Sequence, residues 1–134
     1  MAKLESIEGI GPVYAAKLRE AGIATTEAFL KQCATRAGRK ELAEKTGLSE
    51  KLLLEWTNHV DLFRIKGIGP EYADLLEAAG VDTVPELAQR NPENLYQKLL
   101  EVNAEKKLVR RVPTQDMVRN WVEQAKQLPR VIEY

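Results

Sequence analysis

The chain has 134 residues, of which 44% are hydrophobic and 30% charged, and its 20 basic side chains balance its 20 acidic ones. This composition is typical of a globular protein, and the length is enough for one compact domain or for two very small units that share a core. Zero net charge and an isoelectric point near 6.6 argue against strong nonspecific nucleic-acid binding, because domains dedicated to that task are usually markedly basic.

Several classes of protein are disfavoured by what the sequence lacks. No apolar run approaches the ~20 residues that span a bilayer. Residues 1–5 lack the apolar core of a signal peptide. The single cysteine, Cys33, rules out an internal disulfide and fits a reducing compartment. We therefore expect a cytoplasmic protein.

A glycine-rich turn, Ile7-Glu8-Gly9-Ile10-Gly11-Pro12, opens the chain and is called turn one below. Glycines can adopt positive φ and let another part of the chain approach closely. The proline that follows suits the first turn of a helix, because its φ is already helical. The pattern predicts a helix over residues 12–21 that ends at Gly22.

Three more helices are predicted in the first half. A short helix follows the capping residue Thr25, and another spans about 35–46. Ser49 caps a long helix over 50–63. That helix carries a broad apolar stripe of Leu52, Leu53, Trp56, Val60 and Phe63.

The opening motif returns as Ile65-Lys66-Gly67-Ile68-Gly69-Pro70, called turn two below. The offset is 58 positions (65 minus 7), and the match continues beyond the turn. Matching residues further along are Tyr14 with Tyr72, Ala15 with Ala73, Leu18 with Leu76, and Gly22 with Gly80. Later the offset widens, so that Trp56 aligns with Trp121. The chain therefore reads as a tandem duplication, with repeat one at 1–64 and repeat two at 65–134.

Repeat two is predicted to contain a helix over 70–79 and a capping box at Thr83–Glu86. An inserted helix spans about 92–102, and a last helix spans about 115–128. No alternating apolar pattern is long enough to indicate a sheet. The expected fold is all-α, with two pseudo-symmetric repeats in a single domain over residues 1–134.

Turn one has almost no helix before it, whereas turn two follows the long helix 50–63. In repeat order, the missing helix corresponds to the last one. We therefore predict that the last helix packs beside turn one, with Trp121 close to Ile7 and Leu18, and that the chain termini lie near each other.

The order of helix, Gly-apolar-Gly turn and helix resembles the helix-hairpin-helix motif. Turn two matches the motif from residue 53 to 80, and turn one matches it from residue 4 to 22. The layout, with Trp56-Thr57-Asn58-His59-Val60-Asp61-Leu62 entering turn two and Leu108-Val109-Arg110-Arg111 near the end, also resembles a bacterial family of tandem helix-hairpin-helix proteins with no established activity.

The motif implies sequence-independent DNA binding, in which backbone amides after the second glycine donate to phosphates. Carried over by position, the donors are the N–H groups of Gly11, Val13 and Tyr14, and of Gly69, Glu71 and Tyr72. The resemblance also implies that turn carbonyls near Ile7 and Ile10, or near Ile65 and Ile68, could hold a monovalent cation. No other cofactor or metal is expected.

The charges flanking each turn favour turn one as the phosphate site. Turn two is flanked by three carboxylates and one lysine: Glu71, Asp74, Glu77 and Lys66. Carboxylates repel a phosphate within a Debye length of ~8 Å. Turn one has a balanced set: Lys3, Lys17 and Arg19 against Glu5, Glu8 and Glu20. The alternative is that the glycines only make a tight helix corner. The predicted backbone-binding residues are Gly9, Gly11, Val13, Tyr14, Lys17, Arg19, Gly67 and Gly69.

Two basic clusters could add attraction for phosphate. They are Arg36, Arg39 and Lys40 in repeat one, and Lys106, Lys107, Arg110 and Arg111 in repeat two. The alternative is that they are solvated helix faces paired with nearby glutamates. Residues 42–50 have the spacing of a helix-turn-helix, but their second helix offers few side chains that read base edges, so we interpret them as packing.

Catalysis finds little support in the sequence. The only histidine, His59, has no nucleophile in its sequence context, and Cys33 has no partner that would complete a metal site. We expect a non-enzymatic module that binds the DNA backbone. The alternative is a protein–protein interaction adaptor with no nucleic-acid binding. Salt dependence separates the two, because only phosphate binding weakens steeply with salt.

Overall fold

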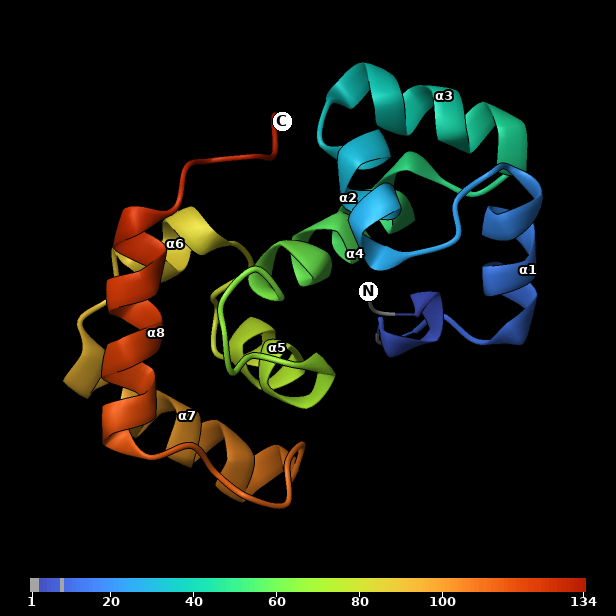
Figure 1. Cartoon of the computed structure of the whole chain (residues 1–134). Coiled ribbons are helices and arrows are strands. Elements are labelled where there is room, and N and C mark those ends of the chain that lie inside the picture. Colours follow the sequence, from blue (N-terminus) through green and yellow to red (C-terminus); the bar gives the residue numbers. More distant parts are fainter. Residues whose placement is uncertain (1–2, 8) are drawn as a thin grey trace. The chain divides into compact units, whose positions relative to one another are not determined.

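The computed structural model describes residues 3–7 and 9–134, and it confirms the all-α fold class (Figure 1). Within these ranges the only extended pairing is one isolated bridge between Lys3 and Thr25. The helical elements are a 3₁₀ turn Leu4–Ser6, α1 Pro12–Glu20, α2 Thr26–Cys33, α3 Arg36–Thr46, α4 Glu50–Leu62, α5 Pro70–Ala78, α6 Val84–Ala88, α7 Pro92–Lys106 and α8 Gln115–Gln127.

The chain forms two compact units. Unit one consists of residues 1–61 together with 131–134, and unit two consists of residues 62–130. Unit one is therefore assembled from two stretches of sequence that are separated by the whole of unit two.

Side-chain caps fix most of the helix starts. Among the described residues, five side chains accept a hydrogen bond from an amide three positions on, at 3.0–3.1 Å: Thr25, Thr35, Ser49, Asn91 and Thr114. Such caps satisfy amides that lack an intrahelical acceptor. Gly47 ends α3 in the left-handed conformation with φ 76°. The predicted boundaries agree with these signals to within a few residues.

The predicted capping box at Thr83 is not formed. The Thr83 hydroxyl donates to a carboxylate oxygen of Glu86 at 3.2 Å, and it caps no backbone amide. Pro85 lies second in α6 and has no N–H, so one of the two amides that a cap could accept from is missing. The hydroxyl bonds to the glutamate instead.

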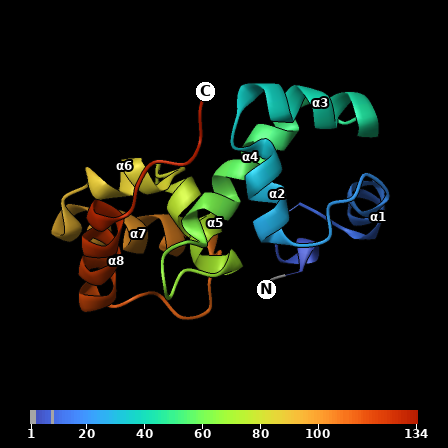
Figure 2. The ribbon, with the colours of Figure 1, turned by 45° about the horizontal axis from the view of Figure 1, so that its top comes forward.

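Unit one is centred on the indole of Trp56, which lies on α4. The Tyr14 ring of α1 meets it edge-on at 5.2 Å between ring centroids, and the Phe29 ring of α2 lies at 6.4 Å. Figure 2 shows α2 alongside α4, with α3 packed next to α2. One aromatic side chain thus joins three helices of the unit.

The segment 131–134 completes unit one. The Glu133 amide donates to the Ala34 carbonyl at 2.7 Å, the Tyr134 hydroxyl donates to the Asn58 side chain at 3.0 Å, and Ile132 is buried. Their partners lie at the end of α2 and on α4.

Unit two has one hydrophobic cluster drawn entirely from its own residues. Helix α8 packs against α6 and α7, and α7 also contacts α5 (Figure 1). The largest side chain in the cluster is Trp121, which is buried and contacts the Tyr72 ring at 5.2 Å.

The predicted position of the last helix is wrong. Trp121 of α8 lies against Gly67 in turn two, whereas Trp56 of α4 takes the corresponding place beside Gly9 in turn one. In each unit the indole comes from the last helix of that unit, α4 in unit one and α8 in unit two. Helix α4, which precedes turn two in the chain, therefore also covers turn one.

Candidate functional site at the glycine turns

The two turns have nearly the same backbone geometry. The first glycine of each has positive φ, 91° at Gly9 and 98° at Gly67. The second glycines, Gly11 and Gly69, are extended. In each turn an isoleucine amide donates to the carbonyl of the isoleucine three residues earlier, at 3.1 Å in turn one and 3.2 Å in turn two. Those carbonyls, proposed above as cation ligands, already accept one hydrogen bond each.

The first glycine of turn two has a second reason to lack a side chain, because a Cβ atom at Gly67 would lie 3.1 Å from the indole nitrogen of Trp121. A Cβ atom at Gly9 would lie 3.4 Å from the indole nitrogen of Trp56, which is an ordinary contact distance. The four isoleucines of the turns, Ile7, Ile10, Ile65 and Ile68, are buried. The turns are therefore held from inside while their glycine backbone faces outward.

Helices α1 and α5 begin directly after the second glycines. Their first backbone bonds run from Ala15 to Gly11 and from Ala73 to Gly69, at 3.0 and 2.9 Å. The amides that precede these bonds have no intrahelical acceptor. They include those of Val13 and Tyr14, and of Glu71 and Tyr72, which the resemblance names as phosphate donors. A helix start of this kind favours an anion electrostatically.

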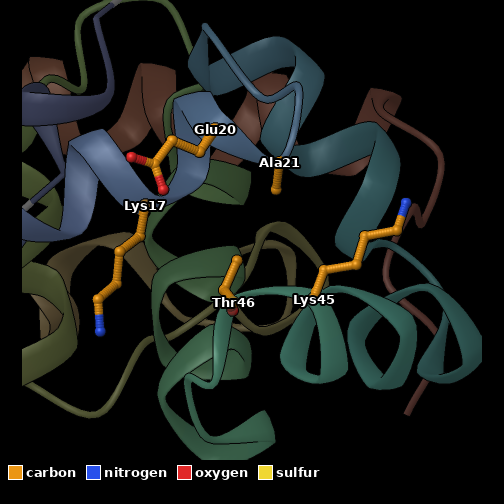
Figure 3. A pocket seen from close by; sticks show the side chains of 5 residues that line it. All are labelled: Lys17, Glu20, Ala21, Lys45 and Thr46. Carbon is orange, nitrogen blue, oxygen red and sulfur yellow. The ribbon is translucent and has the colours of Figure 1, made fainter.

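The basic side chains near turn one are engaged elsewhere or dispersed. The Arg19 guanidinium makes two hydrogen bonds to the Glu5 carboxylate, at 2.8 and 3.1 Å. This hydrogen bonding lowers the pKa of the Glu5 carboxyl and raises that of Arg19. Lys17 lines a pocket with Lys45, but their ammonium groups point away from each other (Figure 3). Turn one therefore does not gather its cations around one point.

Turn two lies in a pocket with two arginines that are remote in sequence. The pocket is lined by Gly67, Gly69, Pro70, Glu71, Tyr72, Arg110 and Arg111. Both arginines are exposed, so their guanidinium groups can reach a bound ligand. Two cations and one carboxylate leave the lining with a net positive charge. The acidic residues that immediately follow turn two in the sequence are therefore not the only charges beside it, because two arginines line the same pocket.

The sequence pattern places Arg110 and Arg111 in a separate basic cluster and favours turn one as the phosphate site. That pattern reports only neighbours along the chain, and the arginines come about forty positions after turn two. No local sequence pattern brings Arg110 and Arg111 to turn two, because helices α5, α6 and α7 lie between them in the chain.

The remaining predicted basic residues differ in their exposure to solvent. Arg39 is only 4% exposed, and its guanidinium donates to the carbonyls of Cys33 at 2.8 Å and of Glu133 at 2.7 Å. Its assignment to a basic patch is wrong, because these carbonyls hold it inside unit one. Four exposed members that do not line the turn-two pocket in the described structure are Arg36, Lys40, Lys106 and Lys107.

In residues 3–7 and 9–134, no group of three or more His, Cys, Asp or Glu side chains could hold a metal ion. No helix in that part of the chain is long and apolar enough to cross a membrane. Cys33 is buried, and burial raises the pKa of its thiol to about 11.

These features define a small all-α protein with two glycine turns. The family model described as "Domain of unknown function (DUF4332)" matches residues 8–128, so the chain belongs to that family. No curated protein and no solved structure matches the chain.

Proposed function

We propose that the protein is a non-enzymatic module that binds the sugar–phosphate backbone of DNA without sequence specificity. In this proposal the two turns are helix-hairpin-helix motifs of a tandem repeat. The observation that carries it is the turn-two pocket, in which the glycine backbone and helix start of α5 share one lining with Arg110 and Arg111.

The mechanism rests on two complementary kinds of donor. The amides at the start of α5 offer short, fixed hydrogen bonds to the oxygens of one phosphate. Guanidinium groups add charge-assisted bonds and match the geometry of phosphate oxygens. None of these groups distinguishes one base from another, so binding follows the backbone rather than the sequence.

The balanced overall charge sets the expected strength. With 20 basic and 20 acidic residues, the attraction must come from the local site. We expect weak binding at physiological salt, in the range of about 10⁻⁴–10⁻⁶ M that is typical of nonspecific complexes. Affinity should rise markedly as salt is lowered.

Fluorescence anisotropy with labelled duplex and single-stranded DNA at ~50 and ~200 mM salt tests the proposal. We expect binding that weakens at the higher salt and does not depend on sequence. The variant R110Q/R111Q should lose most of the affinity. The control K98Q/K126Q removes two exposed lysines from α7 and α8 of the same unit and should lose much less. Absence of binding at ~50 mM salt would refute the DNA proposal.

A protein-interaction adaptor remains the competing function, and one observation favours it. Val13, at the start of α1, is 69% exposed, and Tyr14 beside it is 36% exposed. Exposed apolar side chains at a helix start suit a protein partner better than a phosphate. In that case the protein should bind no DNA at any salt, and V13D should abolish binding of the partner.

A further inference from the structure

The two arginines of the turn-two pocket lie on a short exposed stretch between two fixed points. Val109 before them is buried, and its amide and carbonyl both bond to the Asn103 side chain, at 2.9 and 3.2 Å. Pro113 after them is also buried. Between these anchors, residues 110–112 are exposed to solvent. The position of the arginines therefore depends on what holds this stretch in the middle.

One side chain of α5, that of Tyr72, is hydrogen-bonded to the stretch 110–112. The Tyr72 hydroxyl donates to the backbone carbonyl of Arg111 at 3.0 Å. Within the described part of the chain, residues 110–112 make no other hydrogen bond. The bond from Tyr72 leaves both guanidinium groups unused, because the acceptor is main chain. Tyr72 thus ties the arginine stretch to the first turn of α5, where the candidate phosphate donors lie.

The Tyr72 side chain is itself held in place by packing against Trp121. Its ring contacts Trp121 at 5.2 Å, and the Trp121 indole nitrogen lies against Gly67 in turn two. A continuous series of contacts therefore runs from the turn, through the indole and the phenol ring, to the carbonyl of Arg111. The hydroxyl is the last contact in that series and the only polar one.

The equivalent tyrosine in unit one shows that the hydroxyl is not needed for packing. The Tyr14 ring contacts Trp56 at the same centroid distance of 5.2 Å. Its hydroxyl has no hydrogen-bond partner among the residues that the structure describes. The ring contact with the indole therefore forms in unit one without a described hydrogen bond from the hydroxyl, and the bond from the Tyr72 hydroxyl to Arg111 is an additional contact of unit two.

We propose that Tyr72 is a positioning residue, whose hydroxyl holds Arg110 and Arg111 across turn two and so makes turn two the anion-binding turn of the protein. This inference rests on the proposed function and assigns its site. It predicts that phosphate binding depends on one hydroxyl that does not touch the ligand.

The decisive variant is Y72F in the full chain, which removes the hydroxyl and keeps the ring and the backbone amide. Loss of one hydrogen bond should weaken duplex binding by about three- to tenfold. The matched control is Y96F in α7, because Tyr96 is half-buried in the same unit and its hydroxyl makes no hydrogen bond within the described residues. Y96F should leave the affinity unchanged.

A double-mutant cycle separates positioning from a general effect on stability. Once R110Q/R111Q has removed the guanidinium groups, Y72F should have no further effect on affinity. If Y72F weakens binding equally in both backgrounds, or no more than Y96F does, the positioning role is refuted while DNA binding by the wild type stands.

A second measurement needs no ligand. Amide hydrogen exchange and ¹⁵N relaxation of residues 110–112 should show greater mobility in Y72F than in the wild type or Y96F. Unchanged mobility would also overturn the inference. If the wild-type protein fails to bind DNA while Y72F mobilises this stretch, the proposed function fails and the positioning contact stands.

Discussion

Gly67 and Gly69 are two positions apart in turn two, yet they have different structural roles. Gly67 has φ 98°, and a Cβ atom there would crowd the Trp121 indole. Gly69 is extended with φ −104°, and a Cβ atom there would have no neighbour within 4 Å in the described structure. Only the first glycine is required by the fold.

We therefore expect Gly67→Ala to lower the free energy of unfolding by about 2 kcal/mol, from left-handed backbone strain and crowding of the indole. Gly69→Ala should cost under about 1 kcal/mol, mainly because alanine is a poorer helix cap. Urea unfolding followed by tryptophan fluorescence measures both. Equal losses from the two substitutions would contradict this account.

Cys33 offers a second test at the same scale. Burial raises the pKa of its thiol to about 11, and only the thiolate reacts with alkylating reagents. At pH 8 we expect native protein to react with iodoacetamide at least ~100-fold more slowly than protein unfolded in urea, whose thiol has an ordinary pKa near 8.5. Mass spectrometry over time follows the reaction. Rapid labelling of the native state would show that the thiol is accessible.

At the scale of elements, Arg39 links α3 to the ends of two other segments. Its guanidinium donates to Cys33 at the end of α2 and to Glu133 in the final segment. These are charge-assisted bonds to carbonyls that would otherwise have to find other donors. A buried arginine of this kind stabilises structure and is not free to meet a ligand.

Substitution of Arg39 by methionine should lower the free energy of unfolding by about 2–3 kcal/mol, because it removes bonds to a charged group and leaves carbonyls unpaired. The control is Arg36→Met on the same helix, which is exposed and should change stability by no more than ~0.5 kcal/mol. The Glu133 amide should also exchange faster in the Arg39 variant. If the Arg39 variant is as stable as the wild type and its Glu133 amide exchanges no faster, the contact between Arg39 and Glu133 contributes little to stability.

The elements themselves were largely predictable from sequence, and their packing was not. Gly11-Pro12 and Thr114 carry local signals for helix starts, and the structure uses them. The burial of Arg39 depends on residue 133, far along the chain, and no local pattern reports it. The encounter of Arg111 with Tyr72 is likewise a product of tertiary folding. The glycines and the arginines of the candidate site were therefore both named from the sequence, and what the sequence did not predict is that Arg110 and Arg111 line the same pocket as turn two.

For the whole molecule, the division into units has a consequence for stability. The hydrophobic cluster of unit two is drawn wholly from residues 62–130. We expect a fragment of residues 62–130 to be helical and to unfold cooperatively, although a domain of this size is only marginally stable. Circular dichroism with thermal and urea denaturation tests this expectation.

A fragment of residues 1–61 provides the comparison. It lacks Ile132 and the Glu133 carbonyl, so it should be less stable than the same fragment with residues 131–134 joined by a flexible linker. If both forms of unit one unfold at the same urea concentration, the final segment contributes nothing to its stability.

The order of the segments also bears on biosynthesis. A ribosome releases residues 1–61 of unit one first. The hydrogen bond from Arg39 to the Glu133 carbonyl cannot form until residue 133 has been translated, which happens after the whole of unit two. Domains usually acquire their structure in the order in which they are made. Here the first unit to emerge is the last to be completed, so a nascent chain holds unit one in an unfinished state until translation has passed residue 133.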